Sequence, residues 1–154
     1  MHLTRGEIRS ERLRRLFDYW DRKRGDRAFP ARADLDPLEF RYILGNIAIA
    51  EVERDPLRFR FRLVGTEIVQ RDGTDLTGRY TEDHPQPEYR ALMHRAYSEV
   101  IEAGQPRCHA RERLLDGRMR RYEVLYLPLA SDGQTIDMLL VGIDFPPLPA
   151  PAQS

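Results

Sequence analysis

The chain has 154 residues, of which 41% are apolar and 32% charged, and its net charge is zero. This balance is typical of one soluble globular domain that buries a core without disulfides or metals, and it argues against a disordered chain. No apolar run approaches the roughly 18 to 20 residues of a membrane span, and no signal-peptide core follows the first residues, so we expect a cytoplasmic protein. Cys108 is the only cysteine, which excludes an intrachain disulfide and a cysteine-based zinc site within one chain.

The charges are unevenly distributed along the chain. Residues 1–32 carry ten basic and five acidic side chains, and the remainder carries fifteen and twenty. Clustered cations are what a nucleic-acid-binding arm needs. Here acidic residues are interspersed among the basic ones, as on the solvated face of a helix. We therefore expect a solvated helix face and no nucleic-acid partner. The alternative is that the basic helix docks on the acidic body of its own or of a partner subunit.

Residues 1–28 are predicted to form an amphipathic flanking helix, running from Glu7 to about Lys23 and closed by Gly25 as a C-cap. Its apolar side chains fall within an arc of about 100°. They are Leu13, Leu16, Phe17 and Trp20. This stripe either packs on the sheet of its own domain or pairs with the same helix of a second chain, and in the second case these four residues form the dimer interface.

The segment after this helix is predicted to contain a short helix and a strand. Asp36-Pro37 offers an N-cap followed by proline at the first helical position, which predicts a helix from Pro37 to Leu44. Asn46 to Glu53 is almost continuously apolar in its first half, which is typical of a strand with both faces covered. The turn Arg54-Asp55-Pro56 then predicts an antiparallel hairpin with the next strand.

The stretch from Phe59 to Arg79 begins with strict alternation of apolar and basic residues, the pattern of a strand with one buried and one solvated face. Thr66 is predicted to cap a short helix, and Asp72-Gly73 to end it. The polar segment from Tyr80 to Gln86 is predicted to be a mobile loop.

A second long helix is predicted from Glu88 to Ala103. Its apolar stripe spans about 140° and includes a methionine and two tyrosines. The residues are Tyr89, Leu92, Met93, Ala96, Tyr97 and Val100. Such a stripe is usually plain core, and the alternative is one wall of a ligand pocket.

The last part of the chain is predicted to form three strands. Asp116-Gly117 separates the strand-like runs Arg107–Leu115 and Arg118–Leu129, which predicts a hairpin with a type I′ turn. Thr135 to Phe145 is predicted to be the final strand. Residues 146–154 are rich in proline and are predicted to form an extended or disordered tail.

Four segments together resemble the family of short, single-domain PAS-like sensor proteins of bacteria. They are YWDRKRG at 19–25, FPARADLDP at 29–37, FRFRLVGTEIVQRDGTDLTGR at 59–79 and LPLASDG at 127–133. The resemblance covers most of the chain and is most specific at the RLVGT and DLTGR turns. It implies an α+β fold for residues 29–145, in which a five-stranded antiparallel sheet of order 2-1-5-4-3 carries helices on one face. It also implies a flanking helix that packs on its own domain, forms a homodimer or does both.

The sequence offers little evidence of catalytic chemistry. Four histidines are scattered, and no spacing typical of a metal site, a phosphate-binding loop or a catalytic triad appears. Cys108 and His109 are strand neighbours and point to opposite faces, so they cannot form a nucleophile pair, and we expect Cys108 to be a small buried residue. Among PAS domains, light sensing would need a cysteine on the helical side and haem binding would need His94, which lies off the apolar stripe. The sequence identifies no cofactor.

We therefore predict a non-catalytic PAS-like sensor or signalling module that binds a small molecule or a signalling protein. Polar-tipped or adaptable side chains at predicted inward positions are the cavity candidates. They are Tyr42, Phe61, Thr77, Met93, Tyr97, Tyr122 and Tyr126. The strand that holds the last two could turn either face inward. The alternatives are a purely structural dimerisation adaptor, favoured by a fully packed interior, and a small isomerase-type enzyme with Glu112 or Glu123 as its acid.

Overall fold

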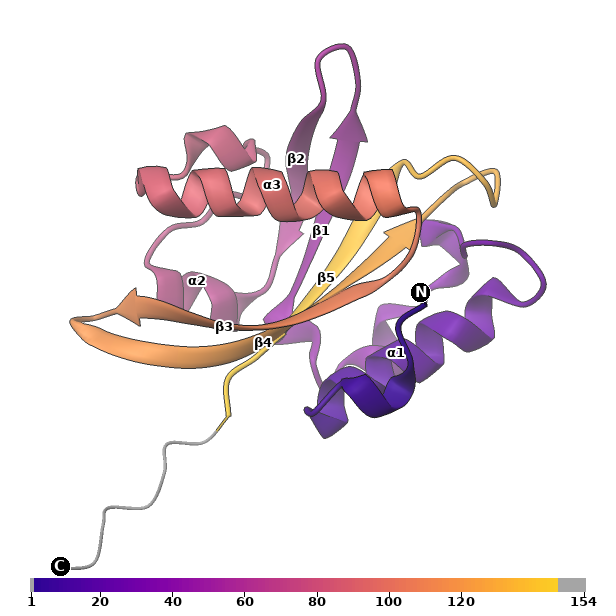
Figure 1. Cartoon of the computed structure of the whole chain (residues 1–154), viewed down its shortest axis with the longest axis horizontal. Helices are drawn as coiled ribbons and strands as arrows, with labels where there is room; N and C mark the ends of the chain where they lie inside the picture. Colours follow the sequence, from indigo (N-terminus) through magenta and orange to yellow (C-terminus); the bar gives the residue numbers. More distant parts are fainter. Residues whose placement is uncertain (1, 147–154) are drawn as a thin grey trace, which may run out of the picture.

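A computed structural model describes residues 2–146 as one five-stranded antiparallel sheet with helices on both faces (Figure 1). The strands are β1 (Ile47–Glu53), β2 (Arg58–Val64), β3 (Arg107–Leu115), β4 (Arg118–Leu129) and β5 (Met138–Asp144). Their order across the sheet is β2-β1-β5-β4-β3, as the family resemblance implied. The tail expected at residues 146–154 lies, apart from Pro146, outside the described residues.

Within residues 2–146, three α-helices and five short 3-10 helices complete the domain. The α-helices are α1 (Glu11–Arg24), α2 (Thr66–Asp72) and α3 (Pro87–Ala103), and the 3-10 helices are η1 (Arg5–Glu7), η2 (Arg32–Asp34), η3 (Pro37–Phe40), η4 (Leu44–Asn46) and η5 (Thr81–Asp83). Figure 1 shows α3 lying across the sheet, and α2 packs against the same face of the sheet as α3. We call this the α3 face, and the opposite face, which α1 covers, the α1 face.

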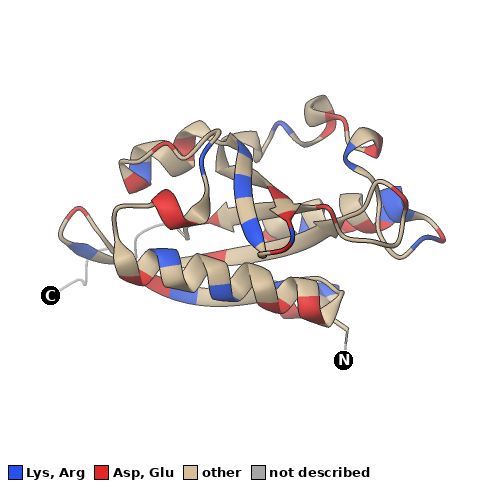
Figure 2. Ribbon diagram, turned by 90° about the horizontal axis from the view of Figure 1, so that it is seen from above, with Lys and Arg blue, Asp and Glu red and all other residues tan. Residues whose placement is uncertain are grey.

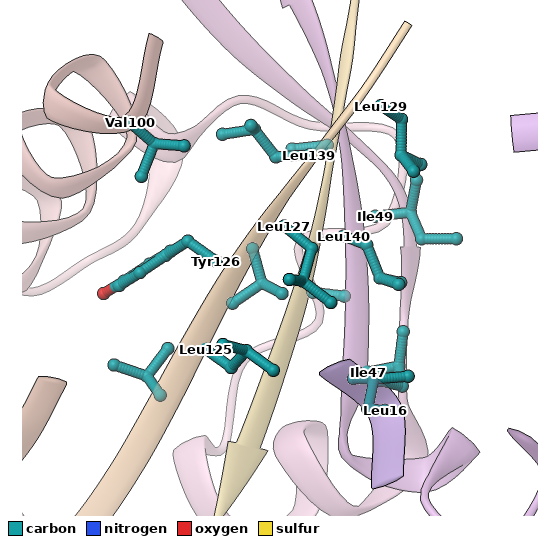
Figure 3. Close-up of a cluster of buried hydrophobic side chains, with 14 of the residues drawn as sticks. Leu16, Ile47, Ile49, Val100, Leu125, Tyr126, Leu127, Leu129, Leu139 and Leu140 are labelled. Atoms are coloured by element: carbon teal, nitrogen blue, oxygen red, sulfur yellow. The ribbon is translucent and has the colours of Figure 1, made fainter. Parts of the chain in front are cut away.

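The apolar stripe of α1 is buried against the domain's own sheet. Leu13, Leu16 and Trp20 are almost completely buried, and the Trp20 indole N–H donates a 2.8 Å hydrogen bond to the carbonyl of Pro128. A Cβ at Gly142 on β5 would lie 2.9 Å from Leu16, so the glycine lets the helix approach the strand closely. Figure 3 shows Leu16 beside Ile47 of the sheet. A partner chain could reach these three side chains only after α1 had left the sheet.

Helix α1 begins at Glu11 instead of the predicted Glu7, because Ser10 takes the N-cap position. The Ser10 hydroxyl accepts a hydrogen bond from the backbone N–H of Leu13, as an N-cap does, and Gly25 ends the helix at φ +59°. The carboxylate of Glu123 accepts the backbone N–H groups of Arg9 and Ser10 at 2.9 and 2.7 Å. These bonds hold the chain extended just before the cap.

Two other local predictions are wrong in detail. Asp36 caps a helix as expected, but the helix is a 3-10 turn that ends at Phe40 instead of Leu44. Thr66 is the first residue of α2, not its cap, because Gly65 takes the N-cap position. A Cβ at Gly65 would lie 2.2 Å from the backbone oxygen of Gly45, so close backbone packing places the glycine there.

The alternation and turn predictions are confirmed. On β2, Phe59 and Phe61 are buried while Arg60 and Arg62 are exposed. Asp116 and Gly117 have φ angles of 51° and 73°, the positive pair that a type I′ turn requires.

Several of the basic residues near the N-terminus are paired with acidic ones. Arg5 bonds Asp18 at 2.8 Å, and Arg27 bonds Asp34 at the same distance. Figure 2 shows blue and red residues interspersed along the helices and loops. This arrangement agrees with a solvated helix face.

Candidate functional site

The interior between α3 and the sheet holds three small cavities that adjoin one another. Their volumes are about 20, 30 and 20 Å³, and Tyr89 lines all three. A space of this size holds a water molecule. In this arrangement of side chains the interior is therefore nearly filled.

Aromatic side chains contribute to the walls of all three cavities. The Tyr97 ring lies edge-on to Phe59, Phe61 and Tyr126, with centroids 5.3, 6.3 and 5.8 Å away. Burial raises the pKa of Tyr126 to about 12, and burial raises the pKa of Tyr97 well above its usual value. The hydroxyls therefore stay protonated at neutral pH and can serve as hydrogen-bond donors. Figure 3 shows Tyr126 pointing toward α3, away from the leucines of the α1 face.

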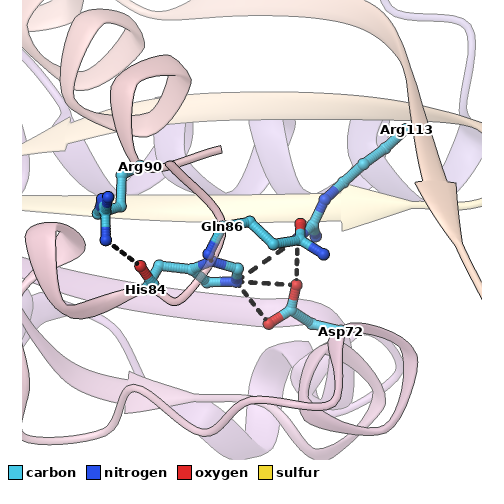
Figure 4. Close-up of polar contacts among 5 residues, drawn as sticks. All are labelled: Asp72, His84, Gln86, Arg90 and Arg113. Carbon is cyan, nitrogen blue, oxygen red and sulfur yellow. Dashed lines mark hydrogen bonds and ion pairs between the residues drawn. The ribbon is translucent and has the colours of Figure 1, made fainter. Parts of the chain in front are cut away.

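A buried polar cluster closes one end of these cavities (Figure 4). The carboxylate of Asp72, at the end of α2, forms an ion pair with Arg113 on β3 and accepts a hydrogen bond from His84 in the loop before α3. The His84 distance is 2.8 Å, and the His84 and Asp72 side chains are 1% and 7% exposed. Three elements that are remote in the chain are thus joined by charge-assisted bonds in a low-dielectric setting, where each bond is strong.

The hydrogen bonds assign the tautomer of His84. The backbone N–H of Gln86 donates to Nδ1 at 3.0 Å, so Nδ1 carries a lone pair. The proton therefore resides on Nε2 and is donated to Asp72. Arg90 of α3 donates to the His84 carbonyl at 3.0 Å, which ties the loop to the helix as well.

Arg113 lies inside the domain in an unusual setting for a guanidinium group. Its Cζ is 3.4 Å from the centroid of the Tyr89 ring, and its side chain is 13% exposed. Stacking and the Asp72 carboxylate together stabilise the charge. The Nε atoms of Arg113 and of nearby Arg71 are buried and have no hydrogen-bond partner among residues 2–146. Both arginines line the same small cavity, so its wall holds unused N–H donors.

Five of the seven predicted cavity residues line these cavities. Phe61, Met93, Tyr97, Tyr122 and Tyr126 all do so, and β4 turns its two tyrosines toward α3. Their contact with a ligand stays a prediction. The placement of the other two residues is wrong. Tyr42 lies by α1 under the guanidinium of Arg15, and Thr77 is exposed in a turn where its hydroxyl donates to Asp75.

The sequence interpretation missed the polar cluster. The sequence places His84 among scattered histidines and predicts a mobile loop for its segment, whereas the structure buries both Thr81 and His84 there. No short sequence motif links Asp72, His84 and Arg113. Asp72 lies 12 positions before His84, and His84 lies 29 positions before Arg113. The only local signal is an aromatic residue at the start of α3, the half-buried Tyr89.

The acids considered for an isomerase do not lie in this interior. Glu123 anchors the segment before α1, and Glu112 is paired with Arg121 at 3.2 Å on the surface of the same α1 face. Cys108 is half-buried there, with Sγ 3.5 Å from Glu123. Burial, and then the Glu123 carboxylate, raise the pKa of the Cys108 thiol to about 12, so it is a poor nucleophile.

His94 is exposed on α3, as expected for an edge histidine. Among residues 2–146, no group of three or more histidine, cysteine or acidic side chains could hold a metal ion. No α-helix in the described part of the chain is long and apolar enough to span a membrane.

A sheet of this order, with a helix crossing one face, defines an α+β domain with the PAS fold. The sequence matches the PAS domain family over residues 8–143, and the chain therefore belongs to that family. PAS domains are generally sensory or signalling modules. No curated protein matches the chain.

Solved structures share this fold. The PAS domain of Bordetella pertussis BvgS is similar at a TM-score of 0.55 and 19% identity, over 75% of this chain and 90% of that one. A sensory box sensor histidine kinase from Vibrio cholerae is similar at 0.51 and 16%, over 72% and 92%. A light-oxygen-voltage domain is similar at 0.53 and 13%, over 72% and 84%. At these identities the likeness shows the fold alone.

Proposed function

We propose that this PAS domain is a non-catalytic sensor of a small molecule that carries an acidic group. The ligand binds between α2, α3 and β3, and its acidic group pairs with Arg113. The observation that carries this proposal is the buried Arg113 guanidinium, which is stacked on Tyr89 beside a cavity and retains an unpartnered Nε. Guanidinium groups bind carboxylates and phosphates through two parallel hydrogen bonds, which gives the site both its affinity and its selectivity.

Binding requires the interior to rearrange, because the cavities are too small for an organic molecule. The ligand's acid displaces Asp72 from Arg113, and its apolar part moves between Tyr89 and the aromatic walls. Only the rearranged state accepts the ligand, so binding shifts the equilibrium toward that state. Asp72, His84 and Arg113 join α2, the loop and β3, so their separation changes how α3 lies on the sheet.

The cytoplasmic location expected from the sequence stays a prediction.

A thermal-shift screen of small organic acids, each paired with its neutral amide or ester, tests the proposal. We expect an acid to raise the melting temperature while its neutral analogue does not. Arg113→Met keeps much of the side-chain volume but removes the charge, so it should abolish the shift. Arg118→Met, on the exposed end of β4, is the matched control and should leave it unchanged. An acid that stabilises the Arg113→Met variant as well as the wild type would refute the assignment of Arg113.

The nearly filled interior favours a second candidate, a structural dimerisation adaptor. An adaptor needs no ligand, and a packed core keeps its surface in one shape. The same screen separates the two candidates, because an adaptor gives no melting-temperature shift with any compound. Native mass spectrometry of the purified protein adds a second readout, since a retained small molecule supports the sensor.

A further inference from the structure

A surface groove of about 620 Å³ lies where the β1–β2 hairpin meets the first half of α3. Figure 1 shows the tip of this hairpin projecting past α3, and η5 packs against both β2 and α3. The hairpin contributes Pro56, Leu57 and Arg58 to the lining, and η5 contributes Thr81 and Glu82. We call this site the hairpin groove. It shares no lining residue with the three interior cavities, so it is a separate site.

One side of α3 forms the other wall of the hairpin groove. Pro87, Arg90, Ala91 and His94 line it, and their spacing of three, four and seven positions from Pro87 places them on one side of the helix. This side differs from the buried stripe that packs on the sheet. Pro87, Ala91 and His94 are exposed, so the wall is accessible to a partner.

The lining of the hairpin groove is partly apolar and open to solvent. Leu57 is half-buried and packs against the core, and Pro56, Pro87 and Ala91 add small apolar surfaces beside it. Five of the nine lining residues are exposed. Small-molecule sites bury most of the surface of their ligand. An open groove with an apolar patch therefore suits a segment of a protein partner better than a small molecule.

Arg58 presents a fixed positive charge on the hairpin side of the groove. Its Cζ lies 3.7 Å from the centroid of the Tyr80 ring, and its Nε donates a 2.8 Å hydrogen bond to Glu82. Stacking and the ion pair hold the plane of the guanidinium group in place. Because the bond to Glu82 uses Nε, the two terminal nitrogens can pair with a second carboxylate.

Arg90 and His94 add cationic and hydrogen-bonding groups on the helix side. One terminal nitrogen of Arg90 donates to the carbonyl of His84 at 3.0 Å, which fixes the guanidinium group at the wall. The His94 ring lies edge-on to Phe59, with the centroids 5.6 Å apart. Within residues 2–146, Glu82 is the only acid that lines the groove, and it is already paired with Arg58. The lining therefore complements an acidic partner.

We propose that the hairpin groove binds an extended acidic segment of a partner protein. An apolar side chain of the segment packs on Leu57 and Ala91, and its carboxylates pair with Arg58 and Arg90, as in other acidic motifs that bind arginine clusters. A ring nitrogen of His94 provides a further hydrogen bond. This gives the signalling partner expected from the sequence a surface and a chemistry. The proposal does not depend on a small molecule bound in the interior.

Selection from a phage-displayed library of random peptides on the immobilised full chain tests the proposal. We expect the enriched peptides to carry acidic residues next to an apolar one. An enriched peptide, made with a fluorescent label, is then titrated by fluorescence anisotropy. Arg58→Gln should weaken its binding about tenfold, because one charge pair is lost. Arg62→Gln is the matched control, since Arg62 lies on the same strand, pairs with Glu51 at 2.7 Å and does not line the groove.

Ala91→Glu provides an independent test on the helix wall. Position 91 is exposed, so the variant should fold normally, as circular dichroism will verify, and its carboxylate should repel the peptide and weaken binding by more than about tenfold. Ala110→Glu adds the same charge at an exposed position of β3 outside the groove and should have no effect. A library that yields no binder would overturn the proposal, and so would enriched peptides that are basic or purely apolar. Binding that tolerates both Arg58→Gln and Ala91→Glu would also overturn it.

Discussion

His84 donates its Nε2 proton to the carboxylate of Asp72 over 2.8 Å, although one residue precedes α3 and the other ends α2. The same carboxylate holds Arg113, so one acid satisfies two buried nitrogen groups from different parts of the chain. The cluster is the polar closure of an otherwise aromatic interior. Its properties lead to the first two predictions.

Asp72→Asn should destabilise the domain by about 3 kcal/mol, because it leaves the Arg113 guanidinium buried without a counter-charge. Urea unfolding followed by circular dichroism measures the change in the free energy of unfolding. Asp26→Asn, at an exposed position outside the cluster, is the control and should change stability by less than about 0.5 kcal/mol. Equal, small effects of the two substitutions would show that the Asp72 pair contributes little.

Combining Asp72→Asn with Arg113→Met should cost less than the sum of the single substitutions. With both charges removed, neither is left buried and unpaired, so the double variant avoids the largest penalty. A double-mutant cycle in urea gives the coupling free energy, which we expect to be at least about 1 kcal/mol. Strictly additive effects would mean that the two residues act independently.

Gly142→Ala should destabilise the domain by about 1 to 3 kcal/mol, because the added methyl overpacks a filled interface. Its Cβ would lie 2.9 Å from Leu16 and 3.0 Å from Leu13. Gly6→Ala places its methyl in open space and is the matched control. Thermal unfolding compares the two variants. A Gly142→Ala protein as stable as the control would show that α1 does not pack on β5 in solution.

Cys108 should react slowly with thiol reagents at pH 8. Burial and Glu123 raise its pKa to about 12, so almost none of it is thiolate at that pH. Against the same cysteine in urea-unfolded protein, we expect the labelling rate to fall by on the order of a hundredfold or more. Absorbance of the released thiol chromophore follows the reaction, and equal rates in folded and unfolded protein would contradict the prediction.

The same pKa predicts how stability depends on alkaline pH. The unfolded thiol ionises near the ordinary pKa of 9.0, below the folded value, so the unfolded state loses its proton first. The stabilisation due to the protonated thiol is therefore complete below about pH 9 and is lost as the pH rises toward 12. Cys108→Ser, compared with the wild type over this range, should remove part of the alkaline decline.

Local patterns in the sequence determined the elements of this domain. The alternation at Phe59 and Phe61 required a half-buried strand, and Asp116-Gly117 required a tight hairpin, because each depends on residues a few positions apart. Gly25 marked the end of α1 for the same reason. The order of the strands came from the likeness to the PAS family, since spacing alone does not select strand neighbours.

Only the tertiary structure decided what each apolar stripe covers and which polar residues meet. The apolar stripe of α1 indicated that one side of this helix is buried. That the stripe packs on the sheet of the same chain depends on Gly142, because the missing side chain lets α1 approach β5 closely. Asp72, His84 and Arg113 come together because α2, the loop and β3 converge over the α3 face. No local sequence pattern predicts this cluster. Burial of a charged side chain is favourable only when it is paired, and here the paired residues are far apart in the sequence.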